Sequence, residues 1–193
     1  GKTISTEELS SAIAVSNQIQ SVITNPSAVQ TLVKMTYNLV GGYSVSVTGS
    51  GDSLSNILME ITTPSSLASI KIVGTSIEYK INNVVVTDQE MEDLFESLPI
   101  SFDTEGNPDL SDPASRNMFI SSVGEIHVTL GADSYILYEV EAVGTTYNTS
   151  IAVAYKNGSL LLKGEYGLDK NTGDTQYVVI NGKDVPSDKW DLL

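Results

Sequence analysis

Helical periodicity dominates the first forty residues of the chain. Ser5 and Glu8 have the spacing of a capping box, in which each side chain binds the backbone N–H group of the other residue. Because Asn25-Pro26 is typical of a cap followed by the first residue of a helix, the pattern predicts one broken or kinked helix over residues 6–40. The apolar residues that recur at helical spacing are Leu9, Ala12, Ile13, Ile19, Val22, Ile23, Val29, Leu32, Val33 and Leu39.

From Tyr43 the apolar positions recur every second residue, which indicates strands at 43–48 and 54–62. In the next segment, turns at Gly74-Thr75 and Asn82-Asn83 make apolar residues face apolar residues and cations face anions. The resulting pairs are Ile72 with Ile77, Ile70 with Tyr79, Lys71 with Glu78, Ile81 with Val84 and Tyr79 with Val86. Residues 70–87 are therefore predicted to form a three-stranded meander with one apolar face.

A second, shorter helix follows this meander. Thr87 and Glu90 repeat the capping-box spacing, and the apolar stripe that follows is Met91, Leu94, Phe95 and Leu98. Residues 100–118 are rich in Asp, Asn, Pro and Ser, and Asp112-Pro113 can begin a helical turn there. We expect a single domain over residues 1–193, in which this loop is the candidate for an internal boundary.

Strand patterns return after Gly124 and continue almost to the end of the chain. The predicted strands cover residues 126–130, 134–143, 147–156, 159–166 and 175–181. Asn157-Gly158 is typical of a two-residue hairpin turn. This turn pairs Tyr155 with Leu160, Val153 with Leu162 and Ile151 with Gly164. We find no tandem repeat, and Trp190 is expected in a packed tail beside Val185 and Leu192.

The order helix, strands, helix, strands predicts the α+β class. Strand pairing places apolar residues on one face of the sheet, and that face needs cover from water. We expect a large curved antiparallel sheet, an incomplete barrel of meander hairpins. A long or kinked N-terminal helix and a short central helix are expected to pack on one face.

The charge balance limits the choice of partner. Ten basic and 24 acidic residues give the 193-residue chain a net charge of −14, which repels nucleic acid and anionic membrane surfaces. Cysteine is absent, and no apolar run approaches the ~20 residues of a membrane span. An acidic chain rich in Ser, Thr, Asn and Gly and poor in Arg is typical of exported bacterial domains. We therefore expect an extracellular or cell-surface location, with any signal peptide or lipid anchor outside this chain.

Few groups in the sequence fit catalysis. His127 is the sole histidine, and it is expected beside Glu125 on the exposed face of a strand, because Ile126 and Val128 face inward. The sequence has no G-x-S-x-G elbow, Walker loop or G-x-G-x-x-G motif, and one histidine without cysteine makes a poor zinc site. We expect a protein that is not an enzyme and has no cofactor.

One acidic loop is a weak candidate for calcium. Asp103, Glu105, Asn107 and Asp109 place oxygen ligands at alternate positions, as loops that bind hard cations do. The loop lacks the EF-hand pattern, and a solvated acidic loop explains the same residues.

The segment Glu-Ile-Thr-Thr-Pro-Ser-Ser-Leu-Ala-Ser-Ile-Lys-Ile at residues 60–72 leads through a Thr63-Pro64 bend into the meander. With Ile77, Tyr79 and Ile81 of the next hairpin, it resembles secreted Gram-positive lipoproteins of the LolA-like kind, which are similar to outer-membrane lipoprotein carriers. In that family a strand ends at a Thr/Ser-Pro-x-x-Leu bend and enters a short hairpin. Its order of a long first helix, strands, central helices and a strand meander also resembles the order predicted here.

The resemblance implies an incomplete barrel whose concave apolar face, covered by helices, holds acyl chains or another apolar ligand. The residues whose apolar faces can line such a cavity are Ile70, Ile72, Tyr79, Val86, Ile151, Val153, Leu160 and Leu162. The same residues can equally fill a dry core beneath the helices. Arg116, the only arginine, lies in the central loop, so no cavity arginine is carried over from the family.

A surface adhesion or structural module is the alternative function. Such a module would bind a protein or glycan through its acidic outer face and its loops. Tyrosine side chains are frequent in contacts of this kind. The tyrosines that can supply them are Tyr43, Tyr135, Tyr138 and Tyr147.

Overall fold

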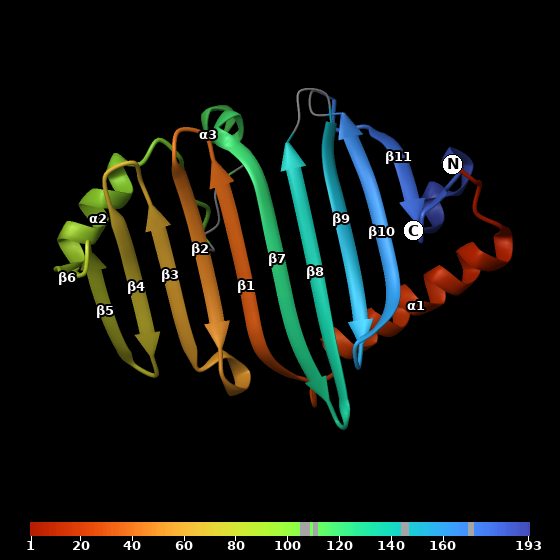
Figure 1. Ribbon diagram of the computed structural model, residues 1–193, viewed down its shortest axis with the longest axis horizontal. Coiled ribbons are helices and arrows are strands. Elements are labelled where there is room, and N and C mark those ends of the chain that lie inside the picture. Colours follow the sequence, from red (N-terminus) through yellow and green to blue (C-terminus); the bar gives the residue numbers. More distant parts are fainter. Residues whose placement is uncertain (105–108, 110–111, 144–146, 170–171) are drawn as a thin grey trace.

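The computed structural model describes the backbone of residues 1–104, 109, 112–143, 147–169 and 172–193. The side chains of Arg116 and of residues 139–143, 147 and 148 lie outside this description. In the described part of the chain, twelve strands form one open antiparallel sheet, and helices lie against it (Figure 1). The predicted α+β class with a large antiparallel sheet is confirmed.

Two meanders of six strands each build the sheet. The first consists of β1 (Val29–Leu39), β2 (Tyr43–Ser50), β3 (Asn56–Thr62), β4 (Leu67–Val73), β5 (Ser76–Ile81) and β6 (Val84–Val85). The second consists of β7 (Phe119–Leu130), β8 (Asp133–Val143), β9 (Tyr147–Lys156), β10 (Ser159–Asp169), β11 (Thr175–Ile180) and β12 (Lys183–Asp184). Antiparallel pairing of β1 with β7 joins them, so the two-residue strands β6 and β12 form the edges of the sheet.

The helical elements are α1 (Thr6–Thr24), η1 (Asp52–Leu54), α2 (Asp88–Ser97), α3 (Pro113–Met118) and η2 (Ser187–Leu192). α1 begins with the predicted capping box, because Ser5 Oγ accepts from Glu8 N–H and Glu8 Oε1 accepts from Ser5 N–H, both at 3.1 Å. α2 also begins where predicted, since Thr87 Oγ1 accepts from Glu90 N–H at 3.2 Å.

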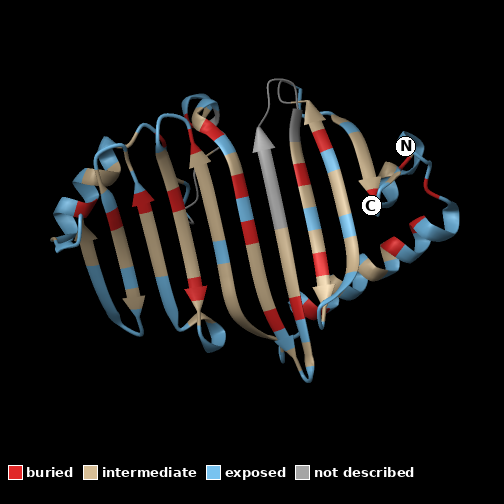
Figure 2. Cartoon of the chain, in the orientation of Figure 1, coloured by how far each residue is buried: buried red, intermediate tan, exposed pale blue. Residues whose placement is uncertain are grey.

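Among the described residues, buried side chains form three apolar clusters on one face of the sheet, which we call the inner face. Figure 2 marks the buried positions in red along the ribbon. Tyr37 packs in the cluster under α2, and Val33 pairs with Ile126 of a cluster under α1. Tyr37 and Val33 point to the same side of β1, so both helices cover the inner face. The cluster under α2 contains Leu39, Val45, Ile61, Ala68, Met91, Ile100 and Phe119.

The predicted second half of the N-terminal helix is wrong, because residues 29–39 form β1. Val33, Met35 and Tyr37 alternate with polar residues along this strand, and that period of two was obscured by the helical spacing of other apolar residues. Asn25 caps the C-terminus of α1 instead, where its Oδ1 accepts a hydrogen bond from Ser27 N–H at 2.8 Å.

The predicted pairings of β4 with β5 and of β5 with β6 are confirmed. The hairpin between β9 and β10 begins in its predicted register, but a β-bulge between Leu160 and Leu162 then shifts the pairing by one residue. Leu162 consequently lies opposite Ala154, and the predicted pairing with Val153 is wrong. Because side chains alternate along a strand, Ile151 and Val153 lie on the outer face, away from Leu162.

The two meanders end in the same arrangement, although the sequence shows no tandem repeat. In each, a two-residue turn leads to the two-residue edge strand, and a valine N–H then donates back across the hairpin. Val86 donates to Tyr79 O and Val185 donates to Val178 O, both at 2.9 Å. A helical segment follows in both cases.

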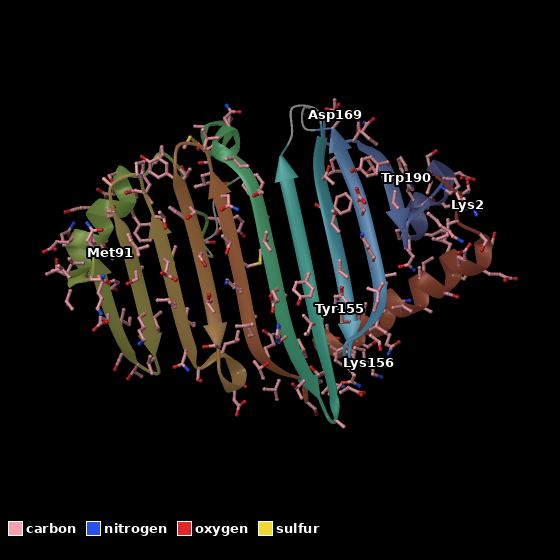
Figure 3. The ribbon with its side chains drawn as sticks, viewed as in Figure 1. Lys2, Met91, Tyr155, Lys156, Asp169 and Trp190 are labelled. Carbon is pink, nitrogen blue, oxygen red and sulfur yellow. The ribbon has the colours of Figure 1, made fainter. Side chains whose placement is uncertain are left out.

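The C-terminal tail is packed beside Val185 as predicted. Trp190 Nε1 donates to Val185 O at 2.9 Å, and its ring packs in an apolar cluster at this end of the sheet. Met91 occupies the corresponding place after the first meander and is 2% exposed. Figure 3 shows the two side chains at opposite ends of the sheet.

Three asparagines at hairpin turns tie each turn to a third strand. Asn82, Asn157 and Asn181 have φ angles of 50°, 48° and 49°, in the left-handed region. Each donates its backbone N–H to a residue of the strand beyond and accepts that residue's N–H on Oδ1, at distances from 2.7 to 3.0 Å. The three residues bound in this way are Leu67, Ser134 and Lys163.

Replacing Asn157 by alanine removes the side-chain acceptor and leaves a Cβ at positive φ. We expect the free energy of unfolding to fall by about 2 kcal/mol, of which the lost hydrogen bonds and the backbone strain contribute about half each. Asn157→Gly relieves the strain alone, so it should destabilise the protein by about 1 kcal/mol. Urea unfolding measures both values, and equal effects of the two substitutions would contradict this account.

Candidate functional site

Apolar contacts hold α1 at both of its ends. Near the N-terminus Leu9 and Ala12 are buried against Ile180 and Val185. Near the C-terminus Val22 is buried in a cluster with Val128 and Tyr135, and Figure 2 shows the buried positions at the two ends of the helix. Full burial of a leucine or valine stabilises by roughly 1.5–3 kcal/mol, so each end is firmly attached.

Polar contacts reinforce the N-terminal end of α1. Ile4 N–H donates to Asp184 O at 2.9 Å, which ties the segment before the helix to β12. The Lys183 ammonium forms an ion pair with Glu8. Hydrogen bonds from Lys183 and from Ser5 lower the pKa of Glu8 from 4.5 to about 2.

Between its two ends, α1 stands away from the sheet and leaves an apolar groove. Two adjoining cavities of about 360 and 240 Å³ make up this groove, and they share Ser16, Ala152, Leu162 and Gly164. The first is lined by Ile19, Gln20 and Ile23 of α1 and by Met35, Gly124, Ile126, Leu137, Tyr138, Val153 and Ala154 of the sheet. The second extends to Ala12, Ile13, Asn17, Glu165, Tyr166, Val178, Ile180, Leu192 and Leu193.

Small residues in the floor create this space. Gly124, Ala152, Ala154 and Gly164 stand where larger β-branched residues are common in strands. No atom lies within 4 Å of the position that a Cβ on Gly164 would take. Ala152 is exposed although it lies beneath the helix, so the floor is not packed against α1.

The described side chains that line the groove offer apolar surface and almost no charge. Among the described side chains that line it, Glu165 is the sole acidic one, and lysine, arginine and histidine are absent. Glu165 lies opposite Ile151 in the sheet, so its strand position points to the outer face. Its carboxylate accepts a hydrogen bond from Tyr177 Oη at 3.4 Å. The arrangement can remove an uncharged chain from water, and within its described lining no nucleophile has an adjacent base.

The structure brings only part of the predicted apolar set to this groove. Leu162 lines it, and Val153 borders it from a strand position that faces outward. Ile151 also has an outward position, and Leu160 is 56% exposed at the hairpin. The remaining predicted residues lie on the first meander: Ile70, Tyr79 and Val86 pack in the cluster under α2, and Ile72 is half-buried.

Sequence reasoning missed the residues that make the groove. Ser16 interrupts the apolar stripe of α1, and it lies over the point that the two cavities share. Gly124 and Gly164 fall inside strands, where glycine weakens pairing and often marks the close approach of another group. These two signals, read together, could have located the groove.

The structure gives little support to catalysis at His127 or to a calcium site in the acidic loop. His127 and Glu125 are hydrogen-bonded neighbours, each with about a third of its side chain exposed. Glu105 and Asn107 of the calcium candidate lie outside the described residues. The calcium site, including the role of Asp103 and Asp109 as ligands, therefore stays a prediction. Among the described residues, no group of three or more His, Cys, Asp or Glu side chains is placed to hold a metal ion.

Fold and groove together define an α+β protein with an open sheet and a helix-covered apolar groove. The chain matches none of the family models, curated proteins or solved structures with which it was compared. The LolA-like resemblance therefore stays a prediction. None of the helices in the described residues is both long and apolar enough to cross a membrane.

The low pKa of Glu8 predicts how the helix anchor responds to acid. Because folding lowers this pKa, the ion pair with Lys183 stabilises the folded chain above pH 4.5, and that contribution is lost as the pH falls through about 2. We expect the side-chain carboxyl carbon of Glu8 to titrate near 2 by NMR and to move back toward 4.5 in Lys183→Met. Lys189→Met is the control and should leave the titration unchanged. A wild-type midpoint near 4.5 would show that the pair does not form.

Proposed function

We propose that this chain is a non-enzymatic binding protein for an apolar or lipid-like ligand, which lies in the groove between α1 and β7–β10. The observation that carries the proposal is the glycine and alanine floor beneath a helix that is packed only at its ends. Glycine at a strand position that could hold valine or isoleucine lowers stability, because it has no side chain to pack against its neighbours. An open space kept at this cost in packing is expected if a ligand fills it.

The chemistry of the lining limits the part of the ligand that is held. Ile19, Ile126, Leu137 and Leu162 supply apolar surface, and no described basic side chain lines the groove to pair with a carboxylate or phosphate. A buried unpaired charge is strongly unfavourable, so the enclosed part of the ligand is uncharged. The larger cavity, of about 360 Å³, falls within the usual range for small-molecule sites, and the cavity of about 240 Å³ adjoins it.

We also propose that the protein acts outside the cytoplasm of a bacterium. The absence of cysteine, the single arginine and the abundance of Ser, Thr, Asn and Gly support this proposal. A net charge of −14 disfavours adsorption to anionic membrane surfaces and favours a soluble carrier that meets its ligand by encounter.

Filling the groove tests the proposed function. A Cβ at Gly164 would meet no atom within 4 Å, and the position faces the groove. Gly164→Leu should therefore keep the circular dichroism spectrum and weaken binding of the apolar dye N-phenyl-1-naphthylamine by about tenfold, ~1.4 kcal/mol. Lys163→Val is the matched control, because it adds an apolar side chain to the adjacent, outward position. Absence of dye binding to the wild type, or equal binding to Gly164→Leu, would overturn the proposal.

The adhesion alternative keeps one supporting observation. Tyr138 and Tyr155 form an edge-to-face pair on the outer face, with ring centroids 5.8 Å apart. Tyr135, by contrast, is 4% exposed in the cluster under α1 and cannot supply a surface contact, and the side chain of Tyr147 lies outside the described residues. The outer aromatic pair is therefore the part of this hypothesis that can be tested.

For an adhesion module, Tyr155→Ser should lower retention on immobilised cell-wall glycan at least about fivefold, because aromatic contacts contribute strongly to interfaces. Gly164→Leu should leave retention unchanged. Retention is measured by affinity chromatography of the intact protein. If the wild-type protein is not retained on the column, the hypothesis that it binds this glycan is contradicted.

A further inference from the structure

Cross-strand pairing aligns nine inner-face residues in a single line from β10 to β5. We call this line the inner row, and its members are Leu162, Ala154, Leu137, Ile126, Val33, Gly49, Ile57, Ile72 and Ile77. Every member is apolar or glycine. The first four line the groove beneath α1, so the apolar floor leaves the groove at β1 and continues across four more strands.

The far end of the inner row is open. Ile57 is 36% exposed, Ile77 is 54% exposed and Ile72 is half-buried between them. Single exposed apolar residues are common on protein surfaces, but these three are aligned and continue the floor of the groove. On the outer face of the same strands the neighbouring line is mixed, with Leu58 opposite Lys71 and Lys71 opposite Glu78, so the continuous apolar line lies on the inner side.

Leu54 covers Gly49, the one member of the inner row that has no side chain. Gly49 has no side chain, and a Cβ there would lie 3.2 Å from Cδ2 of Leu54, which covers the glycine from η1. Ser53 and Leu54 have φ angles of 53° and 57°, a conformation that strains residues with a Cβ. Strained backbone persists where the surrounding structure holds it and is common at functional sites. The row therefore stays apolar through β2.

We propose that the ligand is a long linear apolar chain that lies along the inner row, with one part beneath α1 and the distal part on Ile57, Ile72 and Ile77. This inference rests on the proposed function. Strand spacing gives about 19 Å from β10 to β1 and about 38 Å from β10 to β5. An extended hydrocarbon advances about 1.25 Å per carbon, given C–C bonds of about 1.5 Å, so the two lengths correspond to about 15 and about 30 carbons.

Affinity as a function of chain length tests the inference. Uncharged 1-monoacylglycerols with chains of about 12, 16, 24 and 30 carbons displace the dye, and affinity should rise about twofold for each methylene that is half-buried. For the wild type the rise should continue beyond about 16 carbons, because the open end of the row receives the additional methylenes. In the Ile72→Thr/Ile77→Thr double variant the rise should stop at about 24 carbons, because a longer chain passes β3, about 28 Å from β10, and reaches the substituted residues. The shorter chains should bind as they do to the wild type. Val73→Thr, on the outer side of β4, is the matched control and should resemble the wild type.

The possible outcomes separate this inference from the proposed function. Wild-type affinity that stops rising at about 16 carbons, or a double variant that follows the wild type at every length, would overturn the extended row and leave the groove as the site. Absence of displacement by every chain, together with equal dye binding to Gly164→Leu, would overturn both.

Discussion

Apolar packing at the two ends of α1 determines what the second meander can do. Leu9 and Ala12 at one end and Val22 at the other attach the helix to the inner face, so it spans the strands between them as a cover. Because four floor positions beneath it hold glycine or alanine, the described side chains leave a groove under the middle of the helix. The same sheet is filled under α2, where larger side chains such as Ile61 meet Met91. One sheet thus carries a solid core in one half and a groove in the other.

Local signals predicted much of this fold correctly, because they depend on residues close in sequence. The Ser5–Glu8 capping box and the hairpin turn at Asn82 are of this kind. β1 was misassigned because its apolar residues fit two periods, and pairing with β2 and β7 decides between them. The bulge after Leu160 reversed the faces of β9 relative to the prediction, which a turn motif cannot reveal. The groove depends on the absence of a side chain at Gly164 beneath a distant helix, so no local pattern defines it.

The register of the strand pairs makes the inner face, and not any single residue, the feature on which the proposed function depends. Pairing across nine strands places apolar side chains in one line, although the members are spread from Val33 to Leu162 in the chain. The outer face of the first meander carries charged pairs such as Lys71 with Glu78, which suits a face in contact with water. A difference between the faces is expected in any covered sheet, but here the apolar side extends beyond its cover. That extension joins the groove to the open isoleucines of β3–β5.

Contacts between a bound hydrocarbon and individual methyl groups test the central claim most directly. In methyl-labelled protein with an uncharged monoacylglycerol, intermolecular nuclear Overhauser effects should connect the acyl chain to Ile19, Ile126 and Leu162. Ile61, buried under α2, should show none. Overhauser effects to the outer face alone, or none to any of the three groove residues in the saturated sample, would show that α1 covers no binding site.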